Sequence, residues 1–158
     1  MTSSAEQRRP ARLPPRWFVR GAWAVHRAVV SATGGRLGVW AAKPGGSGVL
    51  RLRTVGRHTG RERKALLGYA EDGPNLVLLA MNGWADPEPA WWLNLQANPS
   101  AKVDLATGSR DVNARLAIDE ERARLWARLN GKSGTLDRYA SLRSRETAIV
   151  ILEPAGPR

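Results

Sequence analysis

The sequence predicts a mainly β protein with flanking helices, in which about six antiparallel strands form a small barrel. Two observations predict this fold: short apolar or alternating runs recur along the chain, and turn residues such as Asp-Gly separate neighbouring runs. Strands joined by short turns pair as antiparallel hairpins, and only short helical patterns interrupt them. A small barrel therefore fits the pattern better than a parallel sheet.

Length and composition limit what the chain can be. With 158 residues and 42% hydrophobic content we expect a single domain: a flexible basic tail at 1–15, an amphipathic helix and glycine-rich linker at 16–48, and the barrel at 49–154. The formal charge of +11 favours an anionic partner, which leaves nucleic acid, acidic lipid and a small polyanion open. Cysteine is absent and two histidines are too few for an imidazole zinc site, so no metal centre is predicted.

Residues 16–30 predict an amphipathic helix. Its two faces carry Phe18, Ala22, Val25 and Val29 on one side and Arg16, Arg20, Trp23 and Arg27 on the other. Its longest stretch without Arg or His, at 21–25, is too short to span a bilayer. Two interpretations stay open, because the helix can dock on the domain or touch a membrane surface. Without a secretory signal pattern, we expect a cytoplasmic protein, either free or at the inner face of the membrane.

The first part of the barrel is predicted as three strands. Residues 49–55 are typical of a half-buried strand, because leucines and a threonine alternate with two arginines. The turn GRHTG leads to a second strand at 62–70, and the turn EDGPN at 71–75 leads to a third at 76–81. An irregular loop at 82–90 follows.

The remaining elements continue the pattern more loosely. A short helix at 91–97 ends at Asn-Pro, and 101–107 with 111–118 read as a hairpin. Asp119 is expected to cap a helix over 120–129. The basic stretch 131–146 shows little periodicity, and TAIVILEP at the end predicts the last strand.

Two short stretches resemble catalytic motifs but lack residues that those motifs require. GKS at 131–133 lacks the glycine that a phosphate-binding loop needs at position 126, where Trp126 stands, and it follows a helix rather than a strand. GGSGV at 45–49 lacks the second glycine of a nucleophile elbow. The sequence therefore predicts neither a nucleotide hydrolase nor an acyl-transfer enzyme.

The stretch GRHTGRER at 56–63 is more informative. A turn bracketed by glycines exposes backbone N–H groups, and Arg57, Arg61 and Arg63 present planar donor groups suited to phosphate or carboxylate oxygens. The same stretch also fits an ordinary solvated turn, so both interpretations stay open.

PAWWLNLQAN at 89–98 adds aromatic and amide groups. Trp91 and Trp92 diverge by roughly a hundred degrees on a helix, so we expect one to face the core and the other a cleft. Asn94 lies on the face of Trp91, where its amide can meet a ligand carbonyl or the end of a strand.

These motifs in order resemble a known family. The succession TVGRHTGRER, LLAMNGWADPEPAWWLNLQANPSAKVDL is similar to the deazaflavin-dependent nitroreductase and quinone reductase family, which uses coenzyme F420. Its members carry T-x-G-R-[KR]-[TS]-G-x-x-R, then A-[SN]-x-G-G-x, then P-x-W-[YH]-x-N-L-x-A-N-P. The resemblance runs from about Leu50 to Leu105, with a looser match at ILEP.

The resemblance implies a split β-barrel at 49–154 with the deazaflavin in a groove. The residues where the family holds the phosphate-bearing, acidic tail are Arg57, His58, Thr59, Gly60 and Arg63. Those on the loop beside the deazaflavin ring are Met81, Asn82, Gly83 and Trp84, and those that pack and bracket the ring are Ala90, Trp91 and Asn94.

The sequence departs from the family pattern at several positions. His58 stands where Lys or Arg is usual, and Trp84 stands where a second glycine is common. Members that reduce menaquinone or nitroimidazoles place three tyrosines over the substrate, at positions that correspond here to Ser133, Leu136 and Tyr139. Only Tyr139 is retained, which sets this chain apart from those members.

The resemblance implies an oxidoreductase that transfers a hydride from reduced F420 to a small or lipophilic quinone, enone or nitro compound. Tyr139, Ser133 or a water molecule would protonate the product oxygen. Two alternatives remain: a non-catalytic F420- or flavin-binding protein of the same fold, and a basic nucleic-acid-binding barrel. The second is less favoured, because the tryptophans are scattered and no RNA-binding signature or base-reading helix is present, so we expect no nucleic-acid partner.

Overall fold

The structure is a computed structural model, and it describes residues 38–156. The predicted tail at 1–15 and helix at 16–30 therefore lie outside the described residues. The elements, in chain order, are β1 (Gly48–Val55), β2 (Glu62–Asp72), β3 (Asn75–Ala80), α2 (Ala90–Ala97), β4 (Ser100–Leu105), β5 (Gly108–Leu116), α3 (Asp119–Asn130), α4 (Thr135–Ala140) and β6 (Ala148–Pro154).

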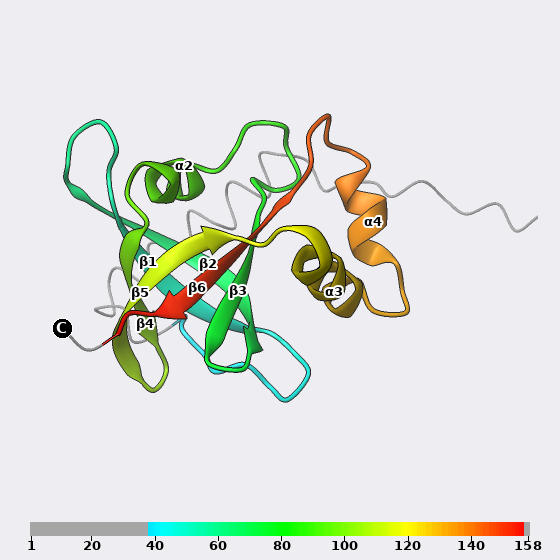
Figure 1. The fold of residues 1–158 in the computed structure, drawn as a ribbon, viewed down its shortest axis with the longest axis horizontal. Coiled ribbons are helices and arrows are strands. Elements are labelled where there is room, and N and C mark those ends of the chain that lie inside the picture. The colour runs from blue at the N-terminus through cyan, green and yellow to red at the C-terminus, as the bar shows by residue number, and fades with distance from the viewer. Residues whose placement is uncertain (1–37, 157–158) are drawn as a thin grey trace, which may run out of the picture.

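The strands form a closed barrel in the order β1-β2-β3-β6-β5-β4, and the pairing of β4 with β1 closes it (Figure 1). Every strand pair is antiparallel. The last strand, β6, lies between β3 and β5 and so joins the two halves of the sheet. The predicted fold of six antiparallel strands with flanking helices is confirmed.

The alternation seen in the sequence of β1 sets its two faces. Leu50 and Leu52 are fully buried in the barrel, while Arg51 and Arg53 point to the outer side and meet Asp104 of β4. The Arg51 Nε donates to Asp104 Oδ2 at 2.7 Å. Burial opposes ionisation of Asp104, but hydrogen bonds from Ser109 and Arg51 outweigh it and hold the pKa of this carboxyl below its ordinary value.

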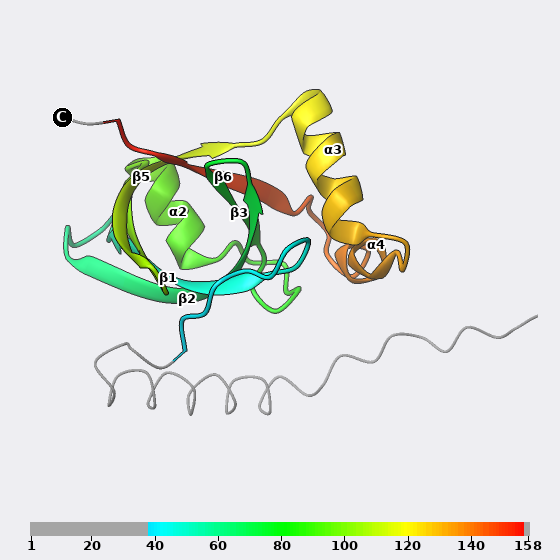
Figure 2. The same ribbon diagram turned by 90° about the horizontal axis from the view of Figure 1, so that it is seen from below.

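The short helix α2 closes one end of the barrel. Trp91, Trp92 and Leu95 of this helix belong to the same apolar cluster as the inward-facing residues of the strands. Figure 2 looks along the barrel and shows α2 lying across its opening. The barrel is thus a filled core, and α2 sits beside the hairpin tip that joins β1 to β2.

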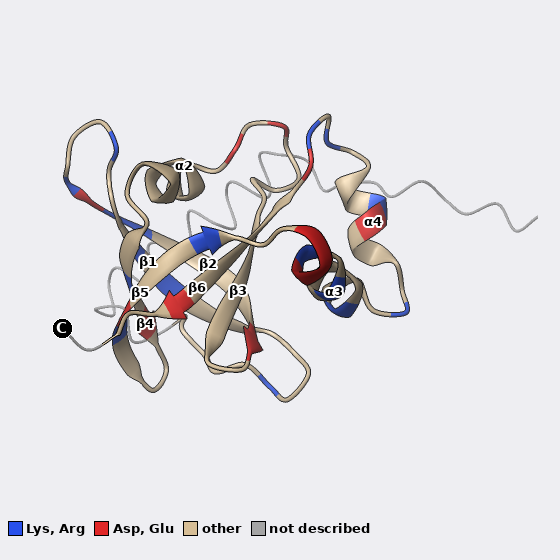
Figure 3. Cartoon of the chain, in the orientation of Figure 1, with Lys and Arg blue, Asp and Glu red and all other residues tan. Residues whose placement is uncertain are grey.

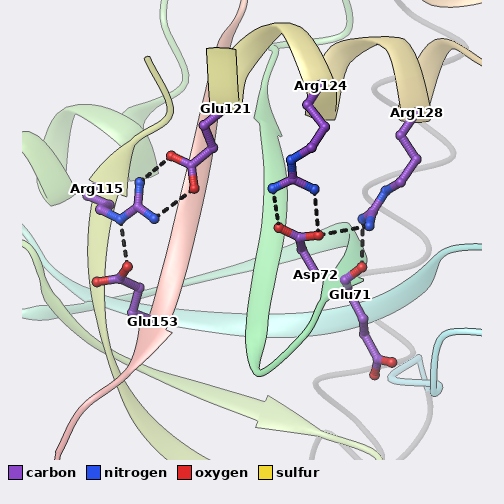
Figure 4. Close-up of polar contacts among 7 residues, drawn as sticks. All are labelled: Glu71, Asp72, Arg115, Glu121, Arg124, Arg128 and Glu153. Carbon is purple, nitrogen blue, oxygen red and sulfur yellow. Dashed lines mark hydrogen bonds and ion pairs between the residues drawn. The ribbon is translucent and has the colours of Figure 1, made fainter. Parts of the chain in front are cut away.

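Helix α3 packs on the outside of β3 and β6, where Leu125 joins Val77, Ile149 and Ile151 in a second apolar cluster. Ion pairs fasten the same helix to the ends of the strands (Figure 4). Arg115 of β5 contacts Glu121 and Glu153, and Asp72 of β2 contacts Arg124 and Arg128, all at distances of 2.6 to 3.0 Å.

One local prediction in this region was wrong. Asp119 is not the N-cap: the helix begins at Asp119, its N-cap is Ile118, and no side chain caps it. The stretch 131–146, for which the sequence predicted no element, contains α4. Its first turn is fixed by Asn130, whose Oδ1 accepts hydrogen bonds from the N–H groups of Leu136 and Asp137. Across residues 38–156 there is no helix with the length and apolar character needed to cross a bilayer.

Candidate functional site

The tip of the β1–β2 hairpin is a tight turn closed by its own backbone. The Gly56 N–H donates to the Arg61 carbonyl, and the Gly60 N–H donates to the Gly56 carbonyl, both at 2.8 Å. Gly60 has φ +67, a conformation that glycine adopts without strain. The two glycines seen in the sequence therefore shape a rigid turn from which the intervening side chains project.

All five predicted tail-binding residues are exposed on this turn: Arg57, His58, Thr59, Gly60 and Arg63. Arg61 is exposed beside them, and Figure 3 shows basic residues on both arms of the tip. Within residues 38–156, no carboxylate lies in ion-pair distance of Arg57, Arg61 or Arg63. Hydrogen bonds from Arg53 instead engage the neighbouring Glu62 and lower its pKa.

Asn94 ties this turn to α2. Its side chain is only 4% exposed, and its Oδ1 accepts hydrogen bonds at 3.2 Å from both the backbone N–H and the guanidinium of Arg57. Its Nδ2 donates to the hydroxyl of buried Thr54 at the end of β1, also at 3.2 Å. The sequence left two partners open for the Asn94 amide, a ligand carbonyl or the end of a strand. The bond to Thr54 matches the second. Asn94 thereby orients Arg57.

The two adjacent tryptophans are arranged differently from the expectation. Trp91 and Trp92 are 8% and 7% exposed, and both pack in the barrel core. Their ring centroids are 6.5 Å apart with a tilt of 56°. Although the two side chains diverge, both enter the apolar core, because α2 lies across the end of the barrel. Ala90, the first residue of the helix, is exposed.

The predicted ring-side loop follows β3. Met81, Asn82 and Gly83 are exposed, and Trp84 is half-buried. Gly83 and Trp84 both have positive φ, +57 and +61, and a bridge between Asn82 and Ala85 closes the turn. A left-handed conformation is uncommon for a bulky residue, so contacts outside the turn must hold Trp84 in place.

Of the two predicted catalytic residues, the structure brings only Tyr139 to this loop. Its ring stacks on Trp84 with centroids 5.7 Å apart and an interplanar angle of 22°. The Ser133 hydroxyl donates to the Asn130 carbonyl at 3.4 Å and accepts from the Thr135 hydroxyl at 2.8 Å. Both hydrogen bonds of Ser133 thus join it to residues at the two ends of the connection between α3 and α4.

The sequence reasoning missed Arg143, which lies between α4 and β6. Its side chain is 0% exposed, and its guanidinium contacts the loop after β3. Nothing in the local sequence distinguishes it from the exposed arginines nearby, because its burial depends on residues about sixty positions earlier in the chain.

The chemistry of these groups suits an anion at the tip and a planar group near the loop. Exposed guanidinium groups without a carboxylate partner among the described residues offer forked donors for phosphate or carboxylate oxygens. Residues 38–156 contain no group of three or more His, Asp or Glu side chains placed to share a metal ion. The donor set therefore fits an acidic organic ligand such as the phosphorylated tail of a deazaflavin.

Comparison with known proteins also indicates an F420-dependent protein. The model of a family described as F420H(2)-dependent quinone reductase matches residues 22–154. An F420H(2)-dependent quinone reductase of Mycobacterium tuberculosis is 32% identical over 131 residues, which cover 81% of this chain and 87% of the relative.

Solved structures share the fold at lower identity. The structure of an F420-H2 dependent reductase (FDR-A) is 23% identical, with a TM-score of 0.60, and the match covers 72% of this chain and 97% of that one. A structure described as a domain-swapped dimer is 22% identical, with a TM-score of 0.61, and covers 89% of this chain and 100% of its own. The chain therefore belongs to the F420H(2)-dependent quinone reductase family, which confirms the predicted class of F420-dependent oxidoreductase and its cofactor.

Proposed function

We propose that this protein reduces a small or lipophilic quinone with reduced coenzyme F420, and that the tip of the β1–β2 hairpin holds the acidic tail of the coenzyme. One observation carries the placement: Arg57, Arg61 and Arg63 are exposed together and have no carboxylate partner among the described residues. Membership of the quinone reductase family supports a quinone as the acceptor. Enones and nitro compounds are further acceptor classes, in keeping with the electrophiles expected from the sequence.

The proposal assigns binding roles to two regions. The tip residues Arg57, His58, Thr59, Gly60 and Arg63 would bind phosphate and carboxylate oxygens of the tail. Met81, Asn82, Gly83 and Trp84 would line the ring, with Ala90 and Trp91 of α2 behind it. Asn94 would act through Arg57, because its own amide is already engaged by Arg57 and Thr54.

Bound reduced F420 supplies a hydride for an electrophilic carbon or quinone. The chain itself supplies binding, orientation and a proton for the product oxygen. The Tyr139 hydroxyl is the better proton source of the two candidates, because its ring stacks on the loop that carries Trp84. Ser133 is bonded to its own connection and is the weaker candidate.

A titration of the protein with oxidised F420, followed by coenzyme fluorescence, tests the function directly. We expect saturable binding at micromolar concentration and, with the reduced form, oxidation of F420 that depends on an added soluble quinone. Binding without turnover across quinones, enones and nitro compounds would favour a coenzyme-binding protein instead. Salt-dependent binding of DNA or RNA without any affinity for F420 would favour the nucleic-acid alternative.

Two variants separate the proton sources. Tyr139→Phe keeps the ring stack and removes only the hydroxyl, so we expect kcat to fall about tenfold or more while the affinity for F420 is unchanged. Ser133→Ala is the matched control and should keep kcat within about twofold. Equal rates for both variants and the unmodified protein would assign the proton to water.

Residues 16–30 would bring the protein to the inner face of the membrane, where lipophilic quinones are found. The support is the sequence alone, in which a basic stripe carrying Trp23 opposes an apolar face. We expect the full chain to sediment with anionic vesicles and a variant lacking residues 1–30 to stay in solution. Equal behaviour of both would assign the helix to docking on the domain.

A further inference from the structure

Arg143 is a charged residue in the interior of the protein, and it has no role in the proposed reaction. Its side chain is 0% exposed, although a guanidinium carries five donors that need partners when water is removed. It lies in the connection that leads from α4 to β6, next to the loop between β3 and α2.

The partners of Arg143 belong mainly to that loop. Its Nη1 donates to the carbonyl of Ala80 at 3.1 Å, its Nε to the carbonyl of Ala85 at 3.1 Å, and its Nη2 to the carbonyl of Asp86 at 3.4 Å. A fourth contact, from Nη1 to the hydroxyl of Thr147 at 2.8 Å, anchors it to the entry of β6. One rigid group thus spans both ends of the segment 81–84.

Acidic side chains strengthen the same attachment. The Ser144 N–H donates to Asp86 Oδ1 at 2.6 Å. Glu88 lies 3.6 Å from Arg143 and 3.8 Å from Arg145, and its buried Oε2 has no hydrogen-bond partner within residues 38–156. Arg143 is therefore both the anchor of the loop and a counter-charge for a largely buried carboxylate.

The segment 81–84 needs such an anchor. Two consecutive residues, Gly83 and Trp84, are left-handed, and a bridge joins Asn82 to Ala85 across them. A tryptophan at φ +61 is disfavoured relative to ordinary backbone, so the free segment would favour other conformations. The guanidinium contacts, with the stack of Trp84 on Tyr139, select this one.

We propose that Arg143 is a positioning residue, which fixes the conformation of the loop 80–88 and thereby the placement of Met81 to Trp84 beside the deazaflavin ring, where the electron acceptor would meet it. The effect on the electron acceptor rests on the proposed function, whereas the effect on the loop conformation rests only on the contacts of Arg143. Arg143 touches neither coenzyme nor acceptor in this assignment and acts through the loop carbonyls.

The test compares two double variants that treat Glu88 identically. In Arg143→Met with Glu88→Gln, the loop anchor is lost and no unpaired charge is left behind. In Arg145→Met with Glu88→Gln, a basic neighbour of the same carboxylate is lost, but among the described residues it is Arg143, and not Arg145, that donates to the loop carbonyls. Amide hydrogen exchange of residues 81–88 and steady-state kinetics with F420H2 and a soluble quinone are measured on both.

For the Arg143 variant we expect amides of 81–86 to exchange at least about tenfold faster than in the Arg145 control, with β3 and β6 unchanged. The KM for the quinone should rise about tenfold while kcat changes much less. Equal exchange in the two variants, or faster exchange spread through β3 and β6, would overturn the positioning role. If the unmodified protein reduces no acceptor, the proposed function fails, but the exchange comparison still decides whether Arg143 fixes the loop.

Discussion

Arginines on two sides of this barrel have opposite surroundings. Along the seam between α3 and the strands, Arg115, Arg124 and Arg128 each contact a carboxylate on another element (Figure 4). At the β1–β2 tip, Arg57, Arg61 and Arg63 project from a glycine turn and meet no carboxylate among the described residues.

The difference divides these arginines into a paired group at the seam and a group at the tip without carboxylate partners among the described residues. At the seam the charges neutralise one another, and their contribution is to hold α3 against the barrel. At the tip the charges stay uncompensated, so they raise the positive potential where an acidic ligand would bind. Both groups consist of arginines, so it is the presence or absence of a carboxylate partner among the described residues that distinguishes them.

The largest expected effect comes from the tip. If the tip holds the coenzyme tail as proposed, Arg57→Ala with Arg63→Ala removes two charge-assisted contacts, each about 1.5–3 kcal/mol when sheltered from water, and F420 affinity should fall about a hundredfold or more. Fluorescence titration measures the affinity, and thermal unfolding should show little change because both side chains are exposed.

The matched control is the seam pair Arg124→Gln with Arg128→Gln, which removes the same charge at a distance from the tip. F420 affinity should stay within about threefold of the unmodified protein, which is the residual effect of net charge. Equal losses of affinity in the two double variants would mean that overall charge matters and the tip does not.

Asn94 links the tip to the core, and its replacement should affect both stability and binding. Asn94→Ala leaves the Arg57 N–H and the Thr54 hydroxyl without their partner, which costs about 1–3 kcal/mol of unfolding free energy. F420 affinity should also fall, because Arg57 loses its orientation. Urea unfolding and titration measure the two effects, and an unchanged affinity would contradict the orienting role.

Sequence patterns predicted the barrel because strand periodicity is local. The leucines of β1 alternate with arginines, and each turn carries its own glycine, so neither feature depends on distant residues. The tip was predicted for the same reason. Helix α4 was missed because its first turn is fixed by Asn130, which belongs to the preceding helix.

The ring side of the site depends on long-range packing and could be predicted only in part. Trp91 and Trp92 were expected on different surfaces, but α2 lies across the barrel end and buries both. Arg143 looks like any exposed arginine until Ala80 and Ala85, about sixty residues earlier, are placed beside it. Such contacts follow from the fold and have no local signature.

Salt provides a third comparison of the two groups. Exposed charges at the tip are screened, so raising the ionic strength from about 0.05 to 0.5 M should weaken F420 binding roughly tenfold. The unfolding free energy should change by much less, because the barrel core is apolar and the seam pairs are worth little individually. Titrations at several salt concentrations, beside urea unfolding at the same concentrations, measure both. F420 binding that is indifferent to salt would place the tail away from the tip.

The smallest expected effect belongs to the seam and concerns Asp72. Hydrogen bonds from Arg124, with a smaller contribution from Arg128, hold its pKa below the ordinary value of 3.8 in the folded protein. A lowered folded pKa means that the stabilisation is complete above about pH 3.8, the unfolded value, and is lost as the pH falls through the folded value. Both arginines are substantially exposed, so the contribution is at most about 1 kcal/mol.

Asp72→Asn isolates this contribution, because all other carboxylates are common to both proteins. Urea unfolding should find the unmodified protein more stable at pH 6 by up to about 1 kcal/mol, and this difference should shrink as the pH is lowered below about 3.8. F420 affinity should be the same in both, since Asp72 pairs with α3 and lies at the end of β2 opposite the tip. A stability difference that persisted at low pH would mean that packing, and not the charge of Asp72, holds the seam together.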